Sequence, residues 1–291
     1  MLDKIFEGLI FEWRDGKTYH LGIDSKDLTS YILTMGSRSR LEITSEYIDL
    51  VDRGGSRLEW IRGFYRDIAI YAFTSGMGAP SAAIAYTEVL KKLYDGIRHG
   101  YIIRIGTSGI LDKSIDRYSL VIPNSIVRNE HVSEYIVPLG YPSDVDAIIY
   151  LTALQTAIDH GYKLGKNLYI GKVETKDDLY FQEGYHNSPY KERIIQIYKA
   201  LSNMGVLATE MELSILPILR DYFRYLAKKE NIDFRVYVGG ILLTLGGELD
   251  REELTEYEHK LVKIGLETLY NINRFLRGEY NIENILRFIS T

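Results

Sequence analysis

The sequence predicts an α/β fold in which helices pack on both faces of a mixed, largely buried β-sheet. Short runs of β-branched and aromatic residues alternate along the chain with longer helical patterns. The chain has 291 residues, of which 46% are hydrophobic, so a sizeable core can form. It contains no linker rich in Pro, Gly or Ser, no repeat and no low-complexity tract. Residues 1–291 are therefore interpreted as a single domain.

The strands are expected where short apolar runs are rich in β-branched and aromatic residues. In chain order these runs are Tyr31–Met35, Tyr47–Val51, Ile68–Thr74, Tyr101–Ile105, Tyr118–Ile122, Leu168–Val173 and Phe234–Thr244.

The helices are expected in longer segments with apolar residues at helical spacing. These segments are Ala79–Ile97, Pro142–His160, Pro189–Met204, Met211–Glu230 and Glu252–Arg277. Pro217 lies inside the fourth segment and should bend its first turns. In folds of this kind, small ligands bind beyond the carboxyl ends of the strands.

The composition excludes several functional classes. The 35 basic and 40 acidic residues leave a net charge of -5, and no stretch is densely basic, so nucleic acid and anionic membrane are poor partners. The absence of cysteine excludes disulfides and thiolate catalysis, and the six histidines lack ligand spacing, so no metal site is predicted. No signal-type segment and no run of 18 apolar residues is present, so a cytoplasmic protein is expected.

Two motifs that follow predicted strands are suited to binding an oxyanion. Gly36 is followed by Arg38 and Arg40, and glycine amides and guanidinium groups both donate to phosphate; the alternative is a solvated turn with surface arginines. Arg104 interrupts the apolar run Tyr101–Ile105 and precedes Gly106-Thr107-Ser108-Gly109. A charge in a buried strand is costly unless it is paired or faces a ligand, so the alternative here is a structural ion pair.

Two further motifs lie at junctions between a strand and a helix. Gly76-Met77-Gly78 resembles half of a dinucleotide fingerprint, but Ser81 occupies the place of the third glycine, so no NAD site is predicted. Glu210-Met211-Glu212 places two carboxylates near the start of a helix. They either grip the hydroxyls of a sugar or simply complement the helix dipole.

Taken together, these segments resemble the nucleoside phosphorylase-I family, specifically its uridine phosphorylase branch. Five motifs occur in the order found in that family: His20-Leu21-Gly22, Gly36 to Arg40, Gly76 to Ser81, Arg104 to Gly109, and Glu210-Met211-Glu212. The resemblance implies a mixed central sheet that is partly closed. It also implies reversible phosphorolysis of a nucleoside, with uridine as the leading expectation, to free base and ribose 1-phosphate.

The resemblance also implies a role for individual residues. The phosphate would be held by Gly36, Arg40, Arg104 and Thr107, with Arg57 reaching in from a neighbouring subunit and Arg53 as its rival. The ribose would be held by Glu212, Glu210, Met211 and, across a subunit interface, His20. Arg104 and Glu212 would be the catalytic pair. Inorganic phosphate would be a co-substrate, no cofactor would be needed, and the homo-oligomer would be built from dimer units, with a hexamer expected.

The base-binding residues implied by the resemblance are Ser108, Gly109, Leu179, Glu183 and Tyr185. Uridine phosphorylases read the uracil edge with a Gln and an Arg, and Glu183 and Tyr185 stand in their places. A carboxylate accepts rather than donates, so Glu183 is expected to repel a carbonyl oxygen and prefer an N–H. Three alternatives stay open: a purine nucleoside phosphorylase, a nucleosidase that uses water, and a non-catalytic nucleoside-binding protein on the same fold.

Overall fold

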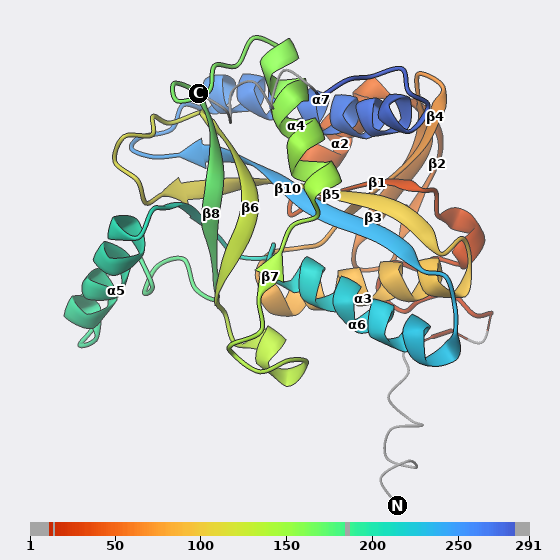
Figure 1. The fold of residues 1–291 in the computed structure, drawn as a ribbon, viewed down its shortest axis with the longest axis horizontal. Helices are drawn as coiled ribbons and strands as arrows, with labels where there is room; N and C mark the ends of the chain where they lie inside the picture. Colours follow the sequence, from red (N-terminus) through yellow and green to blue (C-terminus); the bar gives the residue numbers. More distant parts are fainter. Residues whose placement is uncertain (1–11, 14, 184–186, 283–291) are drawn as a thin grey trace, which may run out of the picture.

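A computed structural model describes residues 12, 13, 15–183 and 187–282. These residues form one sheet with the strand order β10-β6-β8-β9-β5-β1-β4-β3-β2, with β7 beside β6 (Figure 1). Because β10 pairs with both β6 and β5, one end of the sheet closes on itself, and the remaining strands extend from β5 as an open sheet. The strands are β1 Tyr31–Met35, β2 Asp49–Gly55, β3 Glu59–Tyr65, β4 Ile68–Thr74, β5 His99–Ile110, β6 Leu120–Asn129, β7 Ser143–Asp144, β8 Leu168–Lys176, β9 Val206–Glu210 and β10 Arg235–Leu245. The predicted mixed and partly closed sheet is confirmed.

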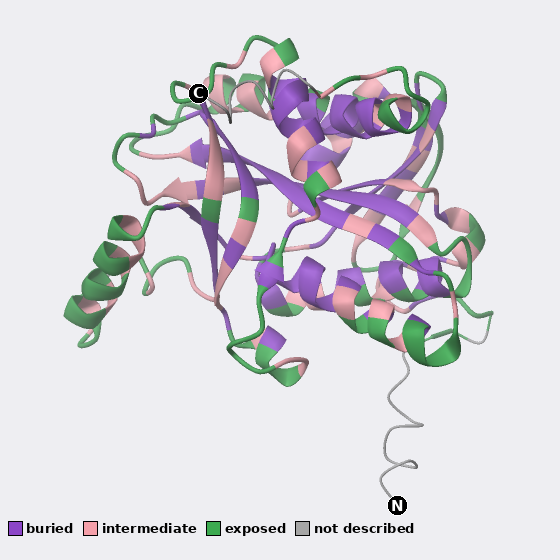
Figure 2. Ribbon diagram, in the orientation of Figure 1, coloured by how far each residue is buried: buried purple, intermediate pink, exposed green. Residues whose placement is uncertain are grey.

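Two layers of helices cover the sheet. On one face, α3 and α6 pack side by side over an apolar cluster, while α2, α4 and α7 cover the other face (Figure 1). The helices are α2 Arg38–Tyr47, α3 Ala79–Asp95, α4 Ala147–Asp159, α5 Lys191–Asn203, α6 Ile215–Glu230 and α7 Arg251–Leu276, with 3-10 turns η1 Ser25–Asp27 and η2 Val132–Tyr135. Figure 2 shows that the strands between the layers are mainly buried, whereas α5 has no buried residue.

Several element boundaries differ from the sequence prediction. Tyr47–Val51 was predicted as a strand, but Tyr47 ends α2 and the strand begins at Asp49. The segment Met211–Glu230 becomes helical only at Ile215. Pro217 therefore lies in the first turn of α6, where backbone N–H groups have no acceptor within the helix. The N–H that proline lacks would make no helical hydrogen bond there, so the predicted bend has no cause.

The register of the parallel strands gathers the motifs at one edge of the sheet. Met35 at the end of β1 pairs with both Thr74 of β4 and Ile105 of β5. The loops that follow β1 and β4 consequently start beside Gly106 of β5. Within the described ranges, no helix combines the length and apolar character needed to cross a membrane, and no group of His, Asp or Glu could hold a metal ion.

Candidate active site

A cavity of about 390 Å³ lies at this edge of the sheet. It is lined from the loops after β1 and β4, from β5, and from the segments that follow β8, β9 and β10. Arg40, Arg104 and Glu212 share it, so the expected convergence of these three side chains is found. The other predicted residues that line it are Gly36, Thr107, Ser108, Gly109, Leu179, Glu183, Glu210 and Met211.

Arg104 is a buried guanidinium held by two carboxylates. Its Nε donates to Glu210 at 3.2 Å and its Nη2 donates to Glu212. Its Nη1 is buried and has no hydrogen-bond partner among the described residues. Burial alone would lower the pKa of Arg104, but the carboxylates of Glu212 and Glu210 outweigh it and raise that pKa. The structural ion pair considered for Arg104 therefore exists, and one donor remains free beside the cavity.

Arg40 lies beside Arg104, on the first turn of α2. Its Nε donates to the hydroxyl of Ser37 at 2.9 Å and lies 3.4 Å from Glu258 of α7. Its Nη1 is also buried without a partner in the described part of the chain. Burial lowers the pKa of Arg40, and the positive charge of Arg104 adds to that effect despite Glu258. An anion in the cavity would offset both the burial of the Arg40 charge and its repulsion by Arg104.

The two carboxylates have different surroundings. Glu210 accepts from the hydroxyl of Thr175 and from the backbone N–H groups of Glu212 and Leu213, both at 2.9 Å. Burial raises the pKa of Glu210, although Arg104 opposes the shift. Glu212 accepts from the N–H of Gly78 at 2.7 Å as well as from Arg104. Glu210 thus fixes the backbone that presents Glu212 to the cavity.

His20 and Arg57 lie together but do not line the cavity of their own chain. The backbone N–H of Arg57 donates to the carbonyl oxygen of His20 at 3.0 Å, and the His20 ring is 2.8 Å from Glu88. Arg57 is exposed, with its guanidinium 6.0 Å from the centre of the Tyr19 ring. The rival Arg53 is an exposed residue whose Nη2 donates to Glu42 at 2.7 Å.

The cavity also contains a basic residue that was not predicted from the sequence. Lys176, at the end of β8, is almost completely buried and pairs with Glu183. Gly109 lets Glu183 approach, because a Cβ there would lie 3.3 Å from its Oε1. The polar run Glu174-Thr175-Lys176, which continues an apolar strand, was the available indication. Tyr185 lies outside the described residues.

Comparisons with known proteins show which proteins this chain resembles in sequence and in fold. Uridine phosphorylase of Treponema pallidum (strain Nichols) is 25% identical over 237 residues, covering 81% of this chain and 84% of the relative. A DeoD-type purine nucleoside phosphorylase of Streptococcus pneumoniae (strain CGSP14) is 28% identical over 210 residues, covering 71% and 78%. The crystal structure of uridine phosphorylase from Vibrio fischeri ES114 superposes with a TM-score of 0.69 at 20% identity, covering 87% of this chain and 97% of that one. Residues 31–219 match the family model of the phosphorylase superfamily, and the chain belongs to that superfamily.

Proposed function

We propose that this chain catalyses the reversible phosphorolysis of a nucleoside to free base and ribose 1-phosphate. The observation that carries the proposal is one cavity in which Arg40 and Arg104 each keep a buried, unpartnered N–H beside Glu212. Buried hydrogen-bond donors normally have an acceptor, so two unpaired donors at one place favour the binding of an anion between them. Relatives named uridine phosphorylase and purine nucleoside phosphorylase support the same reaction.

The phosphate would accept from both guanidinium groups and from the hydroxyl of Thr107. Gly36 would allow the backbone to approach, since a Cβ there would lie only 3.2 Å from the carbonyl oxygen of Gly76. The amino end of α2, capped by Ser37, would add its dipole to the attraction.

The chemistry requires no covalent intermediate. Breaking the glycosidic bond builds positive charge on the sugar and negative charge on the leaving base. Phosphate held below the sugar acts as nucleophile and as counter-charge, so positioning and electrostatics supply the rate. Glu212, presented by Glu210, would hold the ribose hydroxyls, and Met211 would pack against the ring. Inorganic phosphate is the co-substrate, and no cofactor is part of the proposal.

The charge of the cavity supports a site shared between subunits. Within one chain the carboxylates of Glu210, Glu212 and Glu258 face only two guanidinium groups. A phosphate dianion needs a further cation, and neither the exposed Arg57 nor His20, whose ring pairs with Glu88, lines the cavity of its own chain. The proposal therefore includes a homo-oligomer of dimer units, with a hexamer expected, in which these two residues serve the neighbour. A role in nucleoside salvage in the cytoplasm is part of the same proposal.

The base is proposed to be uracil, read by Glu183 together with Lys176. Glu183 alone would repel the uracil oxygens, as expected from the sequence, but the ammonium of Lys176 lies beside it. Glu183 can accept from the uracil N3–H while Lys176 donates to a neighbouring carbonyl oxygen. This pair can thus replace the Gln and Arg of the uridine phosphorylase pattern.

Omitting phosphate tests the reaction. The purified chain is incubated with uridine, with and without phosphate, and the sugar product is identified. Turnover that depends on phosphate and yields ribose 1-phosphate supports phosphorolysis. Equal release of free ribose without phosphate would identify a nucleosidase, and no turnover of any nucleoside would favour a binding protein.

A nucleoside panel tests the base. Uridine is expected to be the best substrate, ahead of inosine and cytidine, and Lys176→Met should reduce its kcat/KM by about tenfold or more through loss of one charge-assisted hydrogen bond. The purine nucleoside phosphorylase relative is the reason to include inosine. A preference for inosine would mean that the site binds a 6-oxopurine and not uracil. The reaction would still be phosphorolysis.

A further inference from the structure

Glu258, on helix α7, does not line the candidate active site but reaches one of its two arginines. The Glu258 carboxylate lies 3.4 Å from Nε of Arg40, and the side chains of Glu258 and Arg40 are only 14% and 8% exposed. Among the described residues, Arg40 is the only cation that pairs with Glu258. A largely buried carboxylate therefore accompanies a guanidinium group that the proposed function assigns to phosphate.

The guanidinium group of Arg40 has different surroundings at its different nitrogens. Its Nε donates to the hydroxyl of Ser37 at 2.9 Å and faces Glu258. Its Nη1 is buried without a partner in the described part of the chain. Its Nη2 lies close to Gly36, because a Cβ on that glycine would be 3.7 Å away. Glu258 thus lies on the Nε side, and the Nη nitrogens are left for an anion in the cavity.

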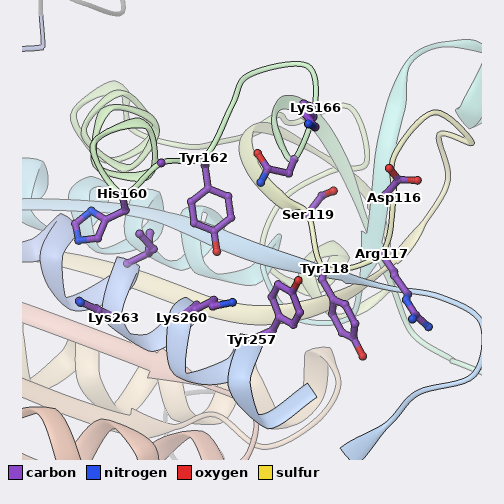
Figure 3. Close-up of a pocket in the computed structure, with 13 residues that line it drawn as sticks. Asp116, Arg117, Tyr118, Ser119, His160, Tyr162, Lys166, Tyr257, Lys260 and Lys263 are labelled. Atoms are coloured by element: carbon purple, nitrogen blue, oxygen red, sulfur yellow. The ribbon is translucent and has the colours of Figure 1, made fainter. Parts of the chain in front are cut away.

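The packing of α7 against α2 sets the position of Glu258. The ring of the next residue, His259, lies 3.2 Å from the hydroxyl of Tyr47 at the end of α2. Another side of α7 faces a different part of the molecule. Figure 3 shows Lys260 and Lys263 beside a second cavity, which has no described lining residue in common with the candidate active site. Glu258 does not line that second cavity, so its charge acts on Arg40.

Two anions that contact one guanidinium group repel each other. Such a carboxylate and phosphate lie within roughly 8 Å of each other, which is about one Debye length at physiological ionic strength. The low exposure of Glu258 further limits screening by water and salt. Burial lowers the pKa of Arg40, and among the neighbouring charges Glu258 opposes that fall most. Glu258 therefore compensates the Arg40 charge in the empty cavity and weakens its attraction for an incoming anion.

We propose that Glu258 is a positioning residue that lowers the affinity of the active site for phosphate. Together with Ser37 it holds the Nε side of Arg40, so that phosphate binds through the Nη nitrogens and is released again. Ribose 1-phosphate carries the same anionic group, so Glu258 promotes the release of this product as well. The inference rests on the proposed function, which assigns Arg40 to the phosphate.

The experiment titrates inorganic phosphate into the full-length protein by calorimetry, without nucleoside and at fixed ionic strength. Glu258→Gln keeps the shape of the side chain and removes its charge, so this variant should bind phosphate about tenfold more tightly than the parent. Glu256→Gln is the matched control, because it removes the same charge from the same helix. Glu256 is 65% exposed and pairs with Lys260 on the surface, so this variant should stay within about twofold of the parent.

The sign of the change separates this role from a merely structural one. A variant that only loosened Arg40 would bind phosphate more weakly, so weaker or unchanged binding by Glu258→Gln would overturn the inference and leave the proposed function intact. Absence of phosphate binding by the parent would contradict both.

Steady-state kinetics and a conservative variant give two further readouts. Glu258→Gln should lower the KM for phosphate and leave the KM for the nucleoside within about twofold. Glu258→Asp keeps the charge, so its affinity for phosphate should stay within about threefold of the parent. Binding by Glu258→Asp as tight as that by Glu258→Gln would show that the charge is not responsible and would also overturn the inference.

Discussion

At the scale of single residues, Arg104 combines two tasks. Two of its nitrogens hold Glu210 and Glu212, and the third is left for a ligand. Arg104→Gln should reduce kcat/KM about 100-fold or more, because one preorganised donor to the reacting phosphate is lost. It should also lower the free energy of unfolding by about 3–5 kcal/mol, because two carboxylates stay buried without their cation. Steady-state kinetics and urea unfolding measure the two effects.

Arg53→Gln is the matched control for that prediction. Arg53 is half-exposed and pairs with Glu42 on the surface, so its loss should change the free energy of unfolding by about 1 kcal/mol or less. Activity should stay close to that of the parent. A loss of activity comparable to that of Arg104→Gln would instead make Arg53, not Arg57, the arginine that serves the neighbouring subunit.

Two histidines should titrate on opposite sides of the ordinary value of about 6.5. Burial, with the nearby Arg235, lowers the pKa of His99, whereas the hydrogen bond to Asp177 raises the pKa of His131. The stability that His131 contributes is therefore present below its unfolded pKa and is lost as the pH rises through its folded pKa. For His99 the sign is reversed, and stability is lost as the pH falls below the unfolded pKa. NMR titration measures both, and Asp177→Asn should return only His131 to the ordinary value.

At the scale of elements, the turn between β4 and α3 positions Glu212 through the N–H of Gly78. Gly76 has a φ of 69°, and a Cβ there would lie 2.2 Å from the Ser81 hydroxyl. Gly76→Ala should therefore cost about 1–3 kcal/mol of stability and raise the KM for the nucleoside. Gly205→Ala is the control, because Gly205 has a similar φ of 76° but open space around it. Equal losses in both variants would mean that only the backbone conformation matters, not the fit against Ser81.

The sequence predicted some elements closely and missed others for identifiable reasons. β1 and β4 have the predicted bounds because apolar β-branched runs there end at glycine or serine. α2 was missed because only its tertiary contacts, through Leu41 and Ile43, compensate for a polar sequence. β9 was missed because its residues Val206–Glu210 end inside the Glu210 motif, which was assigned to a junction between a strand and a helix. These segments become regular through contacts with strands that are distant in the sequence. A local sequence pattern does not contain that information.

At the scale of the whole molecule, the order of motifs predicted which segments meet, but not every contact. Arg40, Arg104 and Glu212 were expected to share a cavity and do. The Lys176–Glu183 pair was not expected, because its members come from opposite ends of one loop and only the fold closes it. The net charge of the cavity also depends on which distant residues the fold brings together, so it could not be predicted from the motifs. Its excess of carboxylates is the reason to expect a cation from a second subunit.

Subunit complementation tests that expectation directly. Arg57→Ala and Glu212→Gln should each be nearly inactive when assembled alone, because each removes one half of every shared site. When the two proteins are unfolded, mixed in equal amounts and reassembled, half of the dimers should contain one chain of each kind. Such a dimer has one site with an intact Glu212 and an intact neighbouring Arg57, so the mixture should recover roughly a quarter of the parent activity. If each site were built from one chain, mixing would give only the mean of the two variants, and Arg57 would have no role across the interface.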